Sequence, residues 1–235
     1  MFLGITNTPR DYAWGAPGAI SALLGRAPSE APEAELWLGT HPGSPSRLVG
    51  AEGTLLDVVG GRLPFLLKVL AAGSPLSLQA HPTTAQARAG FAREEAAGIP
   101  ADAPERNYKD PFHKPELIYA LSERFEALCG FRPAAETRES LERLLERRGP
   151  SAPVRAWIDR LTGDDEIRGV FEWLITRGLG VDELVSSLVG LADDATAALV
   201  TLRELAVAYP GDPGIAISLM LHRVSLERGE VLYLP

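Results

Sequence analysis

The character of the sequence changes twice along the chain, and this pattern restricts the fold more than any other feature. Up to about residue 81, closely spaced glycines and prolines separate short apolar runs, which is typical of strands joined by tight turns. Residues 136–209 instead repeat apolar side chains every three or four positions, as amphipathic helices do. Extended segments return after residue 211. We therefore expect an α+β fold in which a helical block interrupts a β framework.

The same pattern predicts three parts. They are a β-rich N-terminal domain (1–133), a helical subdomain (134–210) and a return to the sheet (211–235). The best strand candidates are residues 35–39, 64–70, 75–81, 115–129 and 215–221, and helices are expected at 54–59 and 83–97. The end of the chain, 225–235, resembles a hairpin that turns at Arg228 and Gly229.

Composition excludes several kinds of partner. The chain is 46% hydrophobic and 23% charged, the balance of a soluble globular protein with a buried core. Its net charge of -8 disfavours nucleic acid and anionic membrane surfaces. No apolar run reaches the roughly 18 to 20 residues that span a bilayer. A single cysteine, Cys129, and the lack of a signal-peptide pattern favour the reducing cytoplasm.

One group of polar residues precedes the first long helix. Ser77, Gln79 and His81 occupy alternate positions, so on a strand their side chains would share one face. Imidazole is a common zinc ligand and an amide oxygen is a rarer one. Taken alone, this spacing favours a hydrogen-bonded polar pair at a strand end over a metal site.

A second group follows that helix. Lys114 and Glu116 are also two positions apart, and Pro115 disfavours helical backbone at the residue before it, so both side chains would face together. A solvated ion pair on an edge strand is the ordinary interpretation. Gln79, His81 and Glu116 together, however, would give one divalent ion three ligands and leave positions open for substrate and water.

Three segments resemble the type I mannose-6-phosphate isomerase family: PFLLKVL at 64–70, SLQAHP at 77–82 and NYKDPFHKPEL at 107–117. The likeness extends to DYAWG at 11–15, ELWLGTHP at 35–42, FEALCGFRP at 125–133 and the stretch from 211 onward. The resemblance implies a cupin-type antiparallel β jelly roll, with the catalytic domain in residues 1–133. It also implies a zinc-dependent enzyme that interconverts two sugar phosphates, mannose 6-phosphate and fructose 6-phosphate.

By this resemblance, Gln79, His81 and Glu116 match three of the family's four zinc ligands, with one Zn²⁺ per chain. The fourth is a histidine in a Gly-x-x-His segment beyond the position of Pro235, and His222 does not match it. We therefore expect a jelly roll incomplete at its C-terminus, and a chain cut short before the family's C-terminal cupin half. A separate C-terminal half is then a conceivable partner, and the chain alone is expected to be weakly active or inactive.

The resemblance also assigns the substrate site. Lys114 is the candidate catalytic residue, since a nearby cation would favour its neutral amine and let it carry a proton. Trp14 matches a residue of the sugar pocket, although ordinary core packing fits it equally well. Lys68 and Ser77 match positions at the phosphate end, where ammonium and hydroxyl groups donate to phosphoryl oxygens. The alternatives are a non-catalytic cupin module that binds metal or sugar phosphate, and a purely structural subunit.

Overall fold

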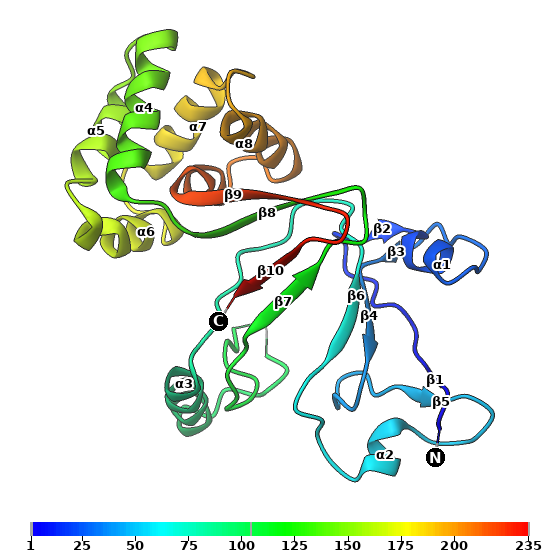
Figure 1. Ribbon diagram of the computed structural model, residues 1–235. Helices are drawn as coiled ribbons and strands as arrows, with labels where there is room; N and C mark the ends of the chain where they lie inside the picture. The colour runs from blue at the N-terminus through cyan, green and yellow to red at the C-terminus, as the bar shows by residue number, and fades with distance from the viewer. Residues whose placement is uncertain (1, 104, 235) are drawn as a thin grey trace. The chain divides into compact units, whose positions relative to one another are not determined.

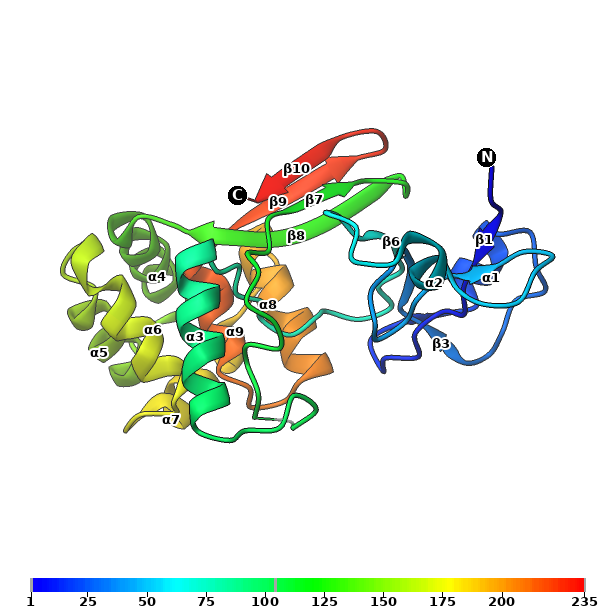
Figure 2. The same ribbon diagram turned by 90° about the horizontal axis from the view of Figure 1, so that it is seen from below.

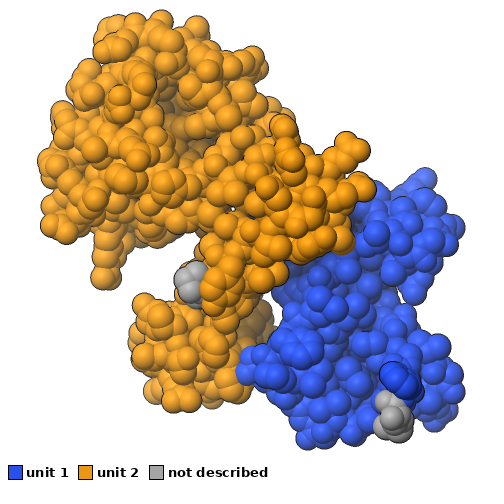
Figure 3. All heavy atoms as spheres, viewed as in Figure 1, with its two compact units in different colours: residues 1–77 blue, residues 78–235 orange. Residues whose placement is uncertain are grey.

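The computed structural model describes residues 2–103 and 105–234, and the chain divides into two compact units. The N-terminal unit is Met1–Ser77 and the C-terminal unit is Leu78–Pro235, coloured blue and orange in Figure 3. Among the predicted site residues, Trp14, Lys68 and Ser77 therefore belong to one unit, and Gln79, His81, Lys114 and Glu116 to the other.

The N-terminal unit consists of short antiparallel strand pairs and two short helices (Figure 1). The pairs are β1 (Ile5–Thr6) with β5 (Arg47–Leu48), β2 (Ala16–Pro17) with β3 (Pro32–Glu33), and β4 (Glu35–Leu38) with β6 (Leu67–Leu70). The helices are α1 (Ala19–Leu23) and α2 (Leu55–Val59). Helix α2 confirms the helix expected at 54–59, and it begins with a capping box between Thr54 and Asp57.

The C-terminal unit is built on one long antiparallel ribbon. Its strands are β7 (Glu116–Tyr119), β8 (Arg124–Phe131), β9 (Leu221–Glu227) and β10 (Val231–Leu234). Strand β8 pairs with β9 and β7 pairs with β10, so the ribbon continues from one pair into the next. The long helix α3 (Thr84–Ala96) precedes β7, as the sequence predicts, and Thr83 caps it.

The turn expected at Arg228 and Gly229 is present, but the two strands beside it do not form a hairpin. Strands β9 and β10 pair with different partners, and the residues between them bond across the ribbon. The Gly229 amide donates to the carbonyl of Ala120, and the Ala120 amide donates to that of Glu230. Gly229 has φ +92°, a left-handed conformation that glycine tolerates, and it lies in the turn at Arg228 and Gly229 after which β10 runs back beside β7 (Figure 1).

The helical block is inserted between β8 and β9, two strands that pair with each other. It contains α4 (Ala134–Arg148), α5 (Ala152–Arg160), η1 (Asp164–Glu166), α6 (Ile167–Ile175), α7 (Val181–Leu191), α8 (Ala197–Ala208), α9 (Gly214–Ile217) and η2 (Ser218–Met220). Figures 1 and 2 show these helices gathered at one end of the β8–β9 ribbon. They share one core in which Trp157, Leu184 and Leu202 are fully buried. The helical subdomain thus encloses its own hydrophobic core.

The strand expected at 215–221 is also wrong, since α9 and η2 cover most of that stretch. The β-branched Ile215 and Ile217 favour extended backbone in the sequence. In the structure both side chains are buried in the helical core, together with Leu219 and Met220. Burial against the neighbouring helices outweighs the local preference of these residues.

Truncation of a core leucine should measure the stability of the helical block. Leu184 on α7 is fully buried, so Leu184→Ala should lower the free energy of unfolding by about 2–5 kcal/mol. Leu179, just before α7, is 97% exposed, so Leu179→Ala should change the free energy of unfolding by less than about 0.5 kcal/mol. Urea denaturation followed by circular dichroism compares the two variants. Equal effects would contradict the proposed core.

Candidate metal and substrate site

His81, Lys114 and Glu116 converge in the C-terminal unit. His81 lies just before α3, whereas Lys114 and Glu116 lie at the entry to β7. The imidazole Nδ1 of His81 is 2.8 Å from the carbonyl oxygen of Lys114. Its Nε2 is 3.9 Å from Oε2 of Glu116, and the other carboxylate oxygen is 3.3 Å from Nζ of Lys114. The two chemistry-bearing motifs, 33 residues apart, therefore meet.

The local sequence explains this convergence. Directly after Pro82, Thr83 starts α3 through a capping box with Gln86. On the returning side, Lys114 precedes a proline and is therefore kept extended. Its amide donates to the carbonyl of Pro82 at 3.4 Å, and Glu116 pairs with Leu234 of β10. These main-chain contacts place the imidazole beside the carboxylate.

The contact with Lys114 fixes the tautomer of His81. A backbone carbonyl only accepts, so Nδ1 of the imidazole carries the proton and donates it. In the neutral ring, Nε2 then keeps its lone pair and points toward the Glu116 carboxylate. Metal-bound histidines usually make such a bond with the nitrogen that does not bind the metal. Two ligands of a tetrahedral zinc ion lie about 3.3 Å apart, so the 3.9 Å between these atoms fits a zinc ion after a small contraction.

The segment around Gln79 differs from the prediction. Residues 75–81 form no strand in the part of the chain that the structure describes. Pro75 and Pro82 frame this segment, and neither offers the N–H that a strand ladder needs. Alternation on a strand is therefore not what orients Ser77, Gln79 and His81. Gln79 is exposed, and its role as a third ligand stays a prediction.

The acidic and imidazole ligands in the predicted set number two. Among the described residues, no three His, Cys, Asp or Glu side chains form a metal-ligating group. His81 and Glu116 are the only members of the predicted set that belong to these four types, and Gln79 would complete it with an amide oxygen. The His81 and Glu116 side chains are both accessible, at 17% and 43% exposed.

In the N-terminal unit, Lys68 is held by two residues of the facing strand. The β4–β6 register pairs Lys68 with Trp37. Nζ of Lys68 is 3.4 Å from Oε1 of Glu35 and 4.9 Å from the centre of the Trp37 ring. The Trp37 indole N–H donates to the other carboxylate oxygen of Glu35 at 2.8 Å. A carboxylate and an aromatic face together fix the ammonium group.

Sequence reasoning missed both Glu35 and Trp37 as partners of Lys68. Trp37 is only half-buried, and its ring contacts Lys68. The signal was present in the segment ELWLG, because alternate positions place Glu35 and Trp37 on one face of β4. What the sequence does not contain is the register that sets Lys68 opposite that face.

Trp14 and Ser77 also lie in the N-terminal unit. Trp14 is half-buried and stacks on Tyr12, with ring centres 5.8 Å apart. Its carbonyl accepts from the amides of Gly73 and Ser74, which ties the turn at Trp14 to the segment after β6. Ser77 is exposed at the end of this unit. We call His81, Lys114 and Glu116 the His81 group. That Trp14, Lys68 and Ser77 lie near this group stays a prediction.

Comparison with known proteins identifies the family. Residues 2–134 match the family model described as phosphomannose isomerase type I, catalytic domain. The chain belongs to the type I phosphomannose isomerase family. The mannose-6-phosphate isomerase of Escherichia coli is 37% identical over 251 residues, which cover 98% of this chain and 63% of that protein. That of Emericella nidulans is 31% identical, over 95% of this chain and 59% of that protein.

Solved structures of this family share the fold. The crystal structure of mannose 6-phosphate isomerase from Salmonella typhimurium, bound to its substrate fructose 6-phosphate and to zinc, matches with a TM-score of 0.83 and 33% identity. The match covers 99% of this chain and 63% of that one. This likeness confirms the predicted fold class, an α+β cupin-type fold with an inserted helical block. The chain thus spans less than two thirds of the length of these relatives. In its described part, no helix has the length and apolar character to cross a membrane.

Proposed function

We propose that this chain belongs to a zinc-dependent aldose–ketose isomerase that interconverts mannose 6-phosphate and fructose 6-phosphate. The observation that carries the proposal is the convergence of His81, Lys114 and Glu116, with the lone pair of the imidazole facing a carboxylate. The relatives support it, since they are named mannose-6-phosphate isomerase and one of their structures holds substrate and zinc. The single free cysteine, Cys129, supports our placement of the enzyme in the cytoplasm.

In this proposal, Gln79, His81 and Glu116 hold the zinc ion. The donor set fits, because a tautomer-fixed imidazole, a carboxylate and an amide oxygen are all groups that zinc accepts. When bound, the ion supplies a Lewis acid that polarises the oxygens on C1 and C2 of the sugar. Three protein ligands leave coordination positions open for those oxygens.

Lys114 is the proposed proton carrier. Isomerisation of the aldose moves a proton from C2 to C1 and a second proton from the C2 hydroxyl to the C1 oxygen, so one group must accept and then return the carbon-bound proton. The Lys114 side chain is 46% exposed and is therefore accessible to a substrate. Its pairing with Glu116 directs the amine toward the metal ligands. A neutral amine at this position would take the C2 proton, and the resulting ammonium would return it to C1.

The N-terminal unit supplies the proposed substrate contacts. Lys68 and Ser77 would bind the phosphate, through an ammonium group and a hydroxyl group. Glu35 and Trp37 already hold the Lys68 ammonium, so it would lose little conformational freedom on binding. Trp14 would pack on the apolar face of the sugar ring. We also retain the proposed division into a catalytic domain (1–133), a helical subdomain (134–210) and a returning sheet segment (211–235).

A coupled enzymatic assay tests this function. The purified full-length protein that contains these residues, loaded with zinc, should form fructose 6-phosphate from mannose 6-phosphate, and a chelator should stop the reaction. Zinc bound at one ion per chain without turnover would contradict the isomerase. That result would favour the alternative, a non-catalytic cupin module that binds metal or sugar phosphate.

A further inference from the structure

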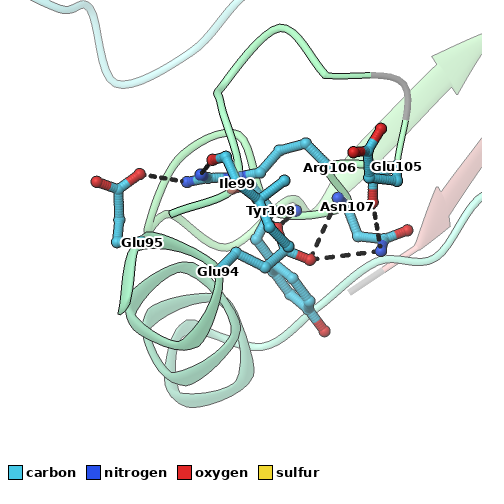
Figure 4. Close-up of polar contacts among 7 residues, drawn as sticks. All are labelled: Glu94, Glu95, Ile99, Glu105, Arg106, Asn107 and Tyr108. Carbon is cyan, nitrogen blue, oxygen red and sulfur yellow. Dashed lines mark hydrogen bonds and ion pairs between the residues drawn. The ribbon is translucent and has the colours of Figure 1, made fainter. Parts of the chain in front are cut away.

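A buried ion pair joins the C-terminal end of α3 to the segment that leads into the site. Glu94 on α3 is 6% exposed and Arg106 is 4% exposed. The guanidinium Nε of Arg106 is 3.1 Å from Oε2 of Glu94 (Figure 4). Buried charges of this kind persist only when other groups bond to them as well.

Both partners meet that condition. Glu94 accepts from the Tyr108 amide at 2.8 Å, from the Asn107 amide at 3.3 Å and from the Asn107 side chain at 3.4 Å. These bonds lower the pKa of Glu94, with the Tyr108 amide as the largest cause. Arg106 donates to the carbonyls of Tyr108 and Ile99 and to the carboxylate of Glu95 (Figure 4). The pair therefore bonds to main-chain atoms at Ile99, just after α3, and at residues 107–108, near the segment that carries Lys114.

Packing strengthens the same contact. The Arg106 guanidinium lies over the Phe91 ring, 5.1 Å from its centre. Gly90 allows Tyr108 to approach α3, because a Cβ at position 90 would lie 2.5 Å from the Tyr108 ring. Residues 106–108 are thus fixed to α3 by charge, by hydrogen bonds and by shape.

We propose that Glu94 and Arg106 are positioning residues for the metal site: they fix the segment that carries Lys114 and Glu116 relative to His81. This inference rests on the proposed function, which assigns a metal site to His81 and Glu116. His81 lies directly before α3 and Lys114 lies six residues after Tyr108, so a rigid α3 with residues 106–108 attached holds both sides of the site.

Chain statistics give the size of the effect. Without the Glu94 and Arg106 contacts, the loop from the end of α3 to Lys114 is about 18 residues long, and with them the free part is about six. Because the probability of loop closure falls as length to the power 3/2, the contacts should favour the closed site about fivefold. Stability alone does not require a buried ion pair, because apolar residues of similar volume are often as stabilising.

The test uses Glu94→Gln, with Glu95→Gln as the matched control. Both remove a carboxylate that pairs with Arg106, but the Glu95 side chain is 54% exposed and accepts from no main-chain amide among the described contacts. Gly90→Ala is a second variant, which displaces Tyr108 and leaves every charge in place. The readouts are the dissociation constant of zinc, and hydrogen exchange of the Lys114 amide in metal-free protein, since that amide bonds to Pro82 when the site is closed.

Glu94→Gln should weaken zinc about fivefold and speed exchange at Lys114 by a similar factor, while exchange on α7 stays unchanged. Gly90→Ala should act in the same direction, and Glu95→Gln should change both readouts less than twofold. Wild-type exchange at Lys114 in Glu94→Gln would overturn the inference, and so would equal acceleration on α7, which indicates global destabilisation. A wild-type protein that neither binds zinc nor turns over would defeat the proposed function, yet the exchange measurement would still decide this inference.

Discussion

Replacement of Lys114 by methionine should abolish isomerase turnover while zinc stays bound at one ion per chain. Methionine has nearly the length of lysine but cannot carry a proton, and general acid–base catalysis contributes about 10²- to 10⁴-fold. The contact that fixes His81 comes from the main-chain carbonyl of Lys114, which the substitution retains. We therefore expect kcat to fall by at least about 100-fold, with little change in the affinity for zinc. A coupled assay and metal analysis of the same preparation measure both quantities.

Lys109→Met is the matched control for this variant. Lys109 is exposed, lies in the same segment and is not part of the His81 group. Its substitution should leave turnover and zinc content at wild-type values. Loss of zinc in Lys114→Met would show that the ammonium supports the metal site through its pair with Glu116, and the role of proton carrier would then be abandoned.

The spacing of Lys114 and Glu116 was enough to predict that they lie together. Alternation around Pro115 placed both on one face, and their side chains pair at 3.3 Å. The same reasoning failed for Ser77, Gln79 and His81, because alternation acts only where a strand has a partner. Residues 75–81 have no ladder in the described structure, and prolines frame them. Alternate spacing in the sequence thus predicts that side chains share one face, but only where those residues do form a strand.

Other parts of the site depend on contacts that sequence spacing does not contain. The bond from His81 goes to a backbone oxygen of Lys114, and every residue type offers such an oxygen. Glu94 and Arg106 look like ordinary charges on a helix and in a loop, although both are buried. Long-range packing decides these features, as it decides the helical state of residues 215–220.

Replacement of His81 by alanine should have the largest effect on the metal itself. Loss of partners that only orient a ligand already weakens metal binding about 10- to 100-fold, so loss of the imidazole should weaken zinc by more than about 100-fold. The variant should also lose turnover, because the ligand pair of His81 and Glu116 is broken. Its fold should persist, since the helical core contains neither residue. Chelator competition measures the affinity, and circular dichroism checks the fold.

His113→Ala provides the comparison that makes this result specific. His113 is exposed, next to Lys114 in the chain, and is not one of the predicted ligands. If the proposed site is right, His113→Ala keeps zinc at wild-type affinity while His81→Ala loses it, although both remove one imidazole from the same part of the chain. The reverse order, or zinc retained by His81→Ala, would place the metal on other residues. The assignment of Glu116 would then fail too, since its position beside His81 is what makes it a candidate ligand, and Gln79 would have no pair to complete.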